Sequence, residues 1–316
     1  MISPLVAICT PVYNGAKYLV ETMDCVQAQD YPNLIHIVLD NASTDATPEI
    51  ISRYSTARVP VITARNPELV PLADNWNFCL KMVPQDAKWF RILCADDLIT
   101  PDATSKMVAV GESDPEIGLV GSGHRLGNEI QDLSWPKDKT VLDGNWAASA
   151  FFRGQFGFFA IQAIYRRDFL TDAPVHDRRL NVHDIKAALA VMLQSKVGLA
   201  HETLGYTRIH EGTVTSDVID KKQLHLAEWF AVLQELGPKA MPEAEFKELY
   251  RRFRRHYFRK LAMWRLRPAA PGIVSDHLAQ LNITRPDGTF LEYVDSLMDW
   301  PLTKVGLRPS WEAWPS

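Results

Sequence analysis

The amino-acid sequence predicts an α/β fold, a parallel doubly wound sheet followed by a helical C-terminal extension. In the N-terminal half, short apolar runs typical of buried strands alternate four times with segments of helical periodicity. After residue 216 the apolar runs stop and only helical patterns remain. We therefore expect a sheet domain over residues 1–216 and a helical extension over residues 217–316.

The predicted strands are short apolar runs stopped by turn or polar chemistry. Pro11 ends the first run, and Asn14-Gly15 supplies a turn before a helix with Leu19, Met23 and Val26 on one face. Thr47 is expected to cap the next helix, with Pro48 at its first position. The predicted strands cover 5–10, 35–39, 59–63 and 89–94, and a third helix covers 73–82.

Composition narrows the class of protein. The chain has 316 residues, 47% of them hydrophobic, which suits one large α/β domain with an appendage. A net charge of -4 gives no general attraction to nucleic acid, so we expect no nucleic-acid partner. The four cysteines show no close-spaced pair and are expected to be reduced, as in a cytoplasmic protein. No secretory signal is seen, and no apolar run reaches the roughly 18 residues of a membrane span.

Polar clusters follow the first, second and fourth predicted strands: Tyr13-Asn14, Asp40-Asn41 and Asp96-Asp97. In an open α/β sheet these positions form the crevice that a nucleotide occupies. Neither a G-x-G-x-x-G nor a P-loop motif is present, so a divalent ion is the candidate for holding phosphates. Asp96 and Asp97 suit such an ion, although either could instead cap the helix that follows.

Several blocks of sequence resemble glycosyltransferase family 2 in the right order: 6–15, 18–19, 28–33 and 38–45. The resemblance covers residues 5 to about 216. It implies the GT-A fold, a nucleotide-diphosphate sugar donor, Mn²⁺ or Mg²⁺, and transfer with inversion. The implied donor is a UDP- or dTDP-sugar, and the implied acceptor is a saccharide or a lipid-linked molecule. The implied role is in bacterial-type surface polysaccharide or glycolipid assembly. The implied nucleotide-sugar contacts are Pro11, Tyr13, Asn14, Asp40, Asn41, Asn75, Asp96 and Arg208.

Two positions depart from the family pattern. Asp96 resembles the last acid of the family's D-x-D motif, which holds the metal, whereas Cys94 stands at the first acid. Asn41 stands where the family usually has an Asp that pairs with the base, and an amide can still accept from a uracil or thymine N–H.

Three later segments complete the implied site. Asp184, in the pair His183-Asp184, resembles the family's general base, with His183 as a neighbour that tunes or packs. Arg208 suits a diphosphate, and His210 joins Asp96 and Asp97 as an implied metal ligand.

Asn75-Trp76-Asn77 resembles a segment that lies near the nucleotide in some bacterial members, and packing of Trp76 in the core is the equal alternative. His176 and His183 lack the H-E-x-x-H spacing of a zinc hydrolase.

The C-terminal extension contains helices predicted over 224–236 and 243–267. In the second helix, Phe253, Tyr257, Leu261 and Trp264 form an apolar stripe among many arginines. Such a stripe either packs on protein or lies on an anionic membrane, which would give peripheral contact at the inner face of the membrane.

The sequence as a whole predicts a metal-dependent inverting glycosyltransferase. A nucleotidyltransferase would need a basic, glycine-rich loop after the first strand, and residues 11–15 contain no arginine. A catalytically silent nucleotide-sugar binder remains the alternative from another class, because Cys94 and Asn41 depart from the family pattern.

Overall fold

The computed structural model describes residues 3–171, 173–210, 221–266, 270–284 and 289–308. The chain divides into two compact units. The first comprises residues 1–147, 156–178 and 183–209, and the second comprises 148–155, 179–182 and 210–316. The predicted domain boundary at 216 lies outside the described residues, and the contacts place the change of unit at 209.

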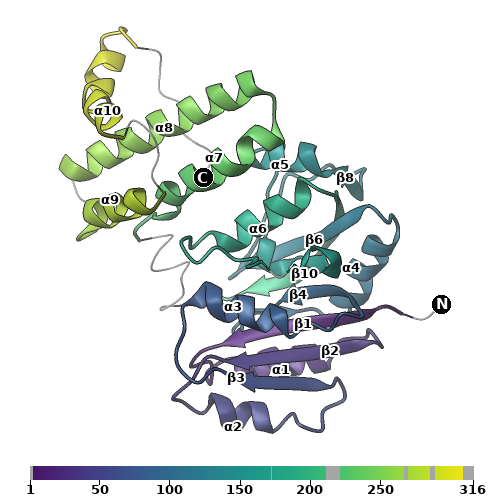
Figure 1. Cartoon of the computed structure of the whole chain (residues 1–316). Helices are drawn as coiled ribbons and strands as arrows, with labels where there is room; N and C mark the ends of the chain where they lie inside the picture. Colours follow the sequence, from purple (N-terminus) through teal and green to yellow (C-terminus); the bar gives the residue numbers. More distant parts are fainter. Residues whose placement is uncertain (1–2, 172, 211–220, 267–269, 285–288, 309–316) are drawn as a thin grey trace. The chain divides into compact units, whose positions relative to one another are not determined.

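The N-terminal half of the sheet is parallel, as the sequence predicts. The order β3-β2-β1-β4 can be followed in Figure 1, and every neighbouring pair in it is parallel. Helices α1, α2 and α3 connect these strands. The bounds are β1 Leu5–Val12, α1 Leu19–Gln27, β2 Leu34–Asp40, α2 Thr47–Ser52, β3 Val61–Arg65, α3 Leu72–Lys81 and β4 Ala87–Ile92.

Beyond β4 the sheet becomes mixed, so the parallel arrangement predicted from the first four strands does not extend over the whole sheet. The short strand β9 (Ile164–Arg166) lies between β4 and β6 (Ile117–Leu126) and runs antiparallel to both. Strand β10 (Lys196–Thr207) pairs parallel with β6 and antiparallel with β5 (Leu98–Ile99) and β8 (Val141–Asp143). Apolar periodicity reports burial and not strand direction, so the sequence did not reveal this insertion.

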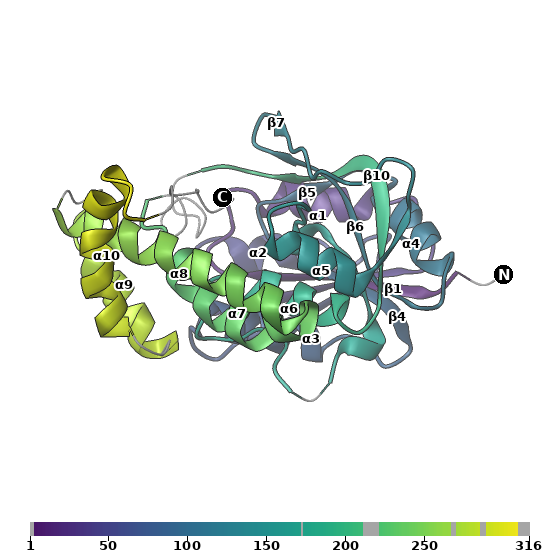
Figure 2. The same ribbon diagram turned by 90° about the horizontal axis from the view of Figure 1, so that it is seen from above.

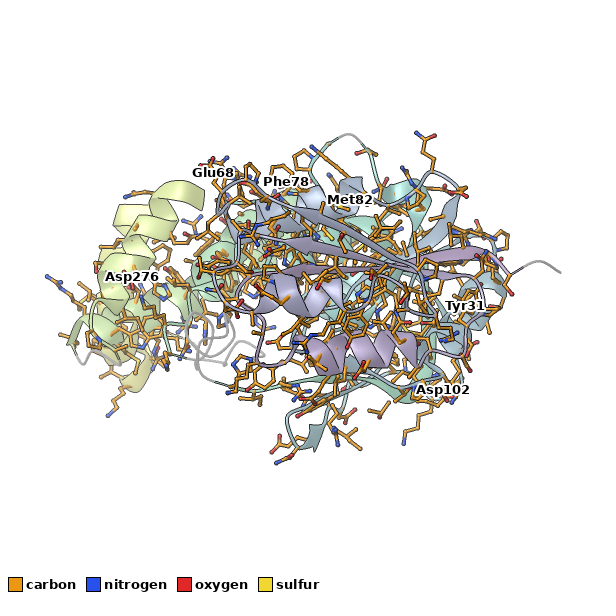
Figure 3. The ribbon with its side chains drawn as sticks, turned by 90° about the horizontal axis from the view of Figure 1, so that it is seen from below. Tyr31, Glu68, Phe78, Met82, Asp102 and Asp276 are labelled. Atoms are coloured by element: carbon orange, nitrogen blue, oxygen red, sulfur yellow. The ribbon has the colours of Figure 1, made fainter. Side chains whose placement is uncertain are left out.

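Buried residues of the strands form the core of the first unit. Val6, Ile8, Trp89 and Ile117 belong to one apolar cluster with residues of α4 (Ala103–Glu112). Helix α3 turns Trp76, Cys79 and Leu80 inward, while Phe78 is exposed on its outer side (Figure 3). All four cysteines are free, as the sequence predicts.

Helix α2 begins differently from the prediction. Thr47 is the first helical residue and not the cap, and its Oγ1 accepts a hydrogen bond from the amide of Gly15 at 2.9 Å. Oδ1 of Asp45 accepts instead from the amide of Thr47 at 3.0 Å. The side chain of Thr47 therefore links two loops instead of capping its own helix.

The second unit is helical, with α7 and α8 side by side in Figure 2. Phe253, Tyr257, Leu261 and Trp264 of α8 are all buried, so the interpretation in which this stripe lies on lipid is wrong. No helix in the described part of the chain is long and apolar enough to cross a membrane. The helices are α7 His225–Ala240, α8 Glu243–Leu266, α9 Ile273–Thr284 and α10 Thr289–Lys304.

Candidate active site

Two loops at the carboxyl ends of β1 and β2 are tied together. The amide of Asn14 donates to Oγ of Ser43 at 2.9 Å, and Oδ1 of Asn14 accepts from the amide of Thr44 at 2.8 Å. Asn14 has a φ of +48°, a left-handed conformation that Asn tolerates better than most residues. Pro11 is buried at the end of β1, whereas Tyr13 is 47% exposed. This rim is fixed from both sides, and Tyr13 projects from it.

Asp40, at the end of β2, is buried and held by the protein. Its carboxylate forms an ion pair with Arg65 of β3 and accepts from the amide of Ser43 at 2.9 Å. The pairing is charge-assisted, so it fixes the carboxylate at the floor of the crevice.

Asn41 uses its side chain within the protein. Its Nδ2 donates to the carbonyl of Val70 at 2.9 Å, and its Oδ1 accepts from the amide of Val70 at 3.1 Å. The same oxygen accepts from Nδ2 of Asn66 at 2.8 Å, and Asn66 also donates to Oδ1 of Asn75 at 2.9 Å. The three asparagines therefore shape the loop between β3 and α3. Asn66 was not among the predicted site residues, because a lone loop asparagine carries no pattern.

Asp97 is 1% exposed, and both of its carboxylate oxygens have protein donors. Oδ2 accepts from Oγ1 of Thr207 at 2.9 Å and from Nε2 of Gln162 at 3.3 Å, and Oδ1 accepts from the amide of Arg208 at 3.2 Å. Burial, followed by the charge of Asp96, raises the pKa of Asp97 to about 7, against the lowering effect of these donors. Asp97 therefore joins the end of β4 to the end of β10.

Arg91 extends this buried polar cluster. Its guanidinium donates to Oε1 of Gln162 at 3.0 Å, and Gln162 in turn reaches Asp97. Burial lowers the pKa of Arg91 to about 10. The sequence shows Arg91 only as a polar interruption of an apolar strand, and Gln162 carries no signal at all.

Arg208 lies directly against Asp96. Its Nε donates to the backbone carbonyl of Asp96 at 2.7 Å, and its terminal nitrogen meets the carboxylate of Glu21 at 2.6 Å. The guanidinium also lies 4.9 Å from the ring centroid of Tyr18. The structure thus brings Arg208 and Asp96 together, although 112 positions separate them in sequence.

Asp184, in the first turn of α6 (His183–Met192), approaches the same region. The charges of Asp97, Asp96 and Asp184 all add to burial in raising the pKa of the Cys94 thiol well above its ordinary value. Burial likewise raises the pKa of Asp184. Asp184 lines a small cavity of about 30 Å³ together with Phe90 and Tyr165. Burial and these three negative charges therefore favour the neutral thiol of Cys94.

Two histidines stand beside Asp184. Nδ1 of His183 lies 3.0 Å from Nδ1 of His176, and both rings meet Trp76 edge-on, with centroids 4.9 and 5.1 Å away. Asn77 holds the backbone of His176, accepting from its amide at 2.9 Å and donating to its carbonyl at 2.8 Å. Within the segment Asn75-Trp76-Asn77, Asn75 thus contacts the loop at Asn66, whereas Trp76 and Asn77 support this histidine pair.

The three predicted metal ligands are placed in different surroundings. Asp96 is half-buried in the first unit, Asp97 is engaged as described, and His210 opens the last segment of the second unit. Within the described ranges, no group of three or more His, Cys, Asp or Glu side chains is arranged to hold a metal ion.

A mixed α/β sheet with this crevice and a helical segment after it is the GT-A arrangement of nucleotide-sugar-dependent glycosyltransferases. The family model for glycosyl transferase family 2 matches residues 7–171. The chain belongs to this family.

Named relatives and solved structures agree with this assignment. An uncharacterized glycosyltransferase of Rickettsia prowazekii is 48% identical over 248 residues, which cover 76% of this chain and 74% of that protein. The succinoglycan biosynthesis protein ExoO of Rhizobium meliloti is 24% identical over 67% of this chain and 63% of its own.

Among solved structures, residues 1–349 of Staphylococcus aureus TarS with UDP superpose with a TM-score of 0.65 at 13% identity, over 97% of this chain and 93% of that one. The mannosyltransferase PcManGT of Pyrobaculum calidifontis, with GDP-Man and Mn²⁺, has a TM-score of 0.61 at 19% identity, over 100% of this chain and 84% of its own. At these identities the structures support the fold alone.

Proposed function

We propose that this protein transfers a sugar, with inversion, from a nucleotide-diphosphate sugar to an acceptor hydroxyl in bacterial surface polysaccharide or glycolipid assembly. Family membership supports the class of reaction. The setting is supported by relatives named for succinoglycan biosynthesis and for abequosyl transfer.

The observation that carries the mechanism is the convergence of Asp96, Asp184 and Arg208. Arg208 donates to the Asp96 backbone, and Asp184 lines a cavity with Ile92, the last residue of β4, in the stretch of chain that leads to Asp96. A group that handles phosphate and a group that handles a proton therefore lie near one another. One inverting displacement needs both at the same anomeric carbon.

A divalent ion fits this donor set at Asp96. Asp97 has both oxygens satisfied, and the soft sulfur of Cys94 is a poor ligand for a hard ion. Mg²⁺ and Mn²⁺ at nucleotide sites are commonly held by one or two carboxylates plus the substrate's own phosphates. We therefore assign the ion to Asp96 and the donor diphosphate, without Asp97. When bound, it would neutralise charge on the departing diphosphate.

The chain's own residues account for the remaining steps. Asp184 accepts the proton of the acceptor hydroxyl while the hydroxyl oxygen forms a bond to the anomeric carbon. The bond from that carbon to the diphosphate oxygen breaks at the same time, and the electron pair leaves with the diphosphate. Arg208 stabilises the negative charge that develops there. The raised pKa of Asp184 favours its role, because a stronger base accepts the proton more readily.

Donor binding would occur along the rim of the β1 and β2 loops. Tyr13 offers an exposed ring, and Asp40 and Asn14 fix the backbone that faces the nucleotide. Asn41 has its donor and acceptor satisfied, so in our proposal it shapes the 66–71 loop instead of contacting the base. Donors with UDP or dTDP are the first to test, since TarS was solved with UDP-GlcNAc.

The test is Asp184→Asn, which keeps the shape of the side chain and removes its basicity. Donor binding should persist while sugar transfer falls by about 10²–10⁴-fold. Asp168→Asn, at an exposed acid of the same unit, is the matched control and should transfer normally. Transfer by Asp184→Asn at the wild-type rate would show that another residue is the base. Saturable donor binding by the wild-type protein, without transfer or hydrolysis across a nucleotide-sugar panel, would favour a silent binder.

A further inference from the structure

Positive charge is concentrated on helix α8. Residues 243–266 contain eight lysines and arginines against three glutamates, a net +5, in a chain whose net charge is -4. Because the apolar stripe of this helix is buried, the cations lie on its remaining faces. Such a concentration raises the local positive potential and favours an anionic ligand.

A cavity of about 550 Å³ lies within the second unit, between α8 and the segment that contains α10. Its walls include one carboxylate, Asp295, and three aromatic rings. Five cations line it: Lys247, Arg251, Arg254, Arg255 and Arg308. The volume far exceeds that of a single water, so the cavity can hold a polyatomic group.

The guanidinium groups of the cavity are held in defined positions. Arg254 lies 5.3 Å from the ring centroid of Tyr250, and Arg255 donates to Oγ1 of Thr303 at 3.1 Å. Arg251 is paired with Glu248 at 2.8 Å. Side chains fixed in this way lose little conformational freedom when a ligand arrives, which favours binding.

The pKa of Asp295 indicates a positive electrostatic potential inside the cavity. Its hydrogen bond from Arg308, followed by the charges of Arg308 and Arg255, lowers the pKa of its carboxyl group. Negative charge is therefore already stabilised at this position. One carboxylate nevertheless meets five lining cations, and counting the neighbouring Glu243 and Glu248 as well still leaves the surroundings positive.

We propose that the α8–α10 cavity is a binding site for a phosphate or diphosphate group. Forked guanidinium donors match phosphate oxygens in pairs, which ammonium groups cannot do. The aromatic walls suit an organic moiety attached to that phosphate. The site lies wholly within the second unit and does not depend on the proposed catalytic residues.

The experiment measures pyrophosphate binding by calorimetry, without divalent ions, to the full chain carrying Asp96→Ala, which removes the metal ligand of the proposed catalytic phosphate site. Arg254→Gln with Arg255→Gln should weaken binding by at least about tenfold, since each lost charge-assisted bond is costly. The matched control is Arg252→Gln with Arg265→Gln, which removes the same charge from exposed positions of α8 outside this cavity. It should bind as the parent does.

A second double variant is used if the first one is destabilised. If the thermal midpoint of the first variant falls, Lys247→Gln with Arg251→Gln, both exposed, replaces it. Absence of binding, or equal loss in the Arg252 and Arg265 control, would overturn the proposal.

Vesicles of phosphatidylglycerol and of phosphatidylcholine then separate the sources of phosphate. Binding to the anionic vesicles that needs Arg254 and Arg255 supports a lipid headgroup. Pyrophosphate binding without vesicle binding supports a soluble phosphate compound.

Discussion

Nδ1 of His176 lies 3.0 Å from Nδ1 of His183, with Trp76 edge-on to both rings. Only one of two facing nitrogens can carry the shared proton, so one imidazole donates and the other accepts. A second proton would leave two N–H groups facing each other in a buried place. The contact therefore excludes two protonated rings, and burial, which lowers the pKa of both histidines, favours the neutral pair beside Asp184.

Folding stability should fall in mild acid because of buried histidines. Burial lowers the pKa of His36 and of His176 to about 3. The unfolded chain binds more protons than the folded chain between that value and about 6.5, so stability is full above pH 6.5 and is lost as the pH falls. Each histidine should cost about 2 kcal/mol at pH 5. The raised pKa of Asp97 acts in the opposite direction, so urea midpoints at pH 7.5 and pH 5 are measured in an Asp97→Asn background, where equal midpoints would contradict the prediction.

Asn77→Asp should disturb the histidine pair without touching the donor. The new carboxylate loses the donor to the His176 carbonyl and faces that oxygen with negative charge. The expected destabilisation is about 1–3 kcal/mol, and sugar transfer should fall more than donor affinity. Asp74→Asn on the same helix is the control. Unchanged stability and transfer in Asn77→Asp would show that this clamp is unimportant.

Donor binding should require a divalent ion, and Asp96→Ala should weaken it far more than Asp97→Ala. Asp96 is the assigned ligand, whereas Asp97 accepts three hydrogen bonds from the protein. Asp97→Ala should therefore lower the thermal stability of the protein instead of its donor affinity. Calorimetry of a nucleotide-diphosphate sugar in Mn²⁺, Mg²⁺ and EDTA measures the first effect, and thermal melts measure the second. Equal affinity in Mn²⁺ and in EDTA would remove the metal from the mechanism.

Asp97→Asn should be milder than Asp97→Ala. Burial disfavours the charged carboxylate and raises its pKa to about 7, so a neutral amide suits this position and still offers one acceptor oxygen to the donors there. We expect Asp97→Asn to keep most of the thermal stability that Asp97→Ala loses. Equal melting temperatures for the two variants would show that hydrogen bonding at this side chain contributes little.

The sequence by itself determined the first four strands, their order of appearance and the polar clusters that follow three of them. These features depend on near neighbours in the chain: most of the apolar runs become buried strands, and Asn14 accepts a left-handed turn. Pro11 does not end the first strand as predicted, because β1 continues to Val12. Family membership was likewise readable, because the matching blocks lie in the N-terminal half.

Only the tertiary structure decided what each polar side chain does. Thr47 serves the loop at Gly15 instead of capping its own helix, Asn41 is satisfied by Val70 and Asn66, and Asp97 is satisfied by the end of β10. The position of β9 between β4 and β6, antiparallel to both, is likewise seen only in the tertiary structure. Hydrogen-bond capacity is visible in a sequence, but the partner is not, because partners from distant segments outcompete local ones once burial makes an unpaired group costly.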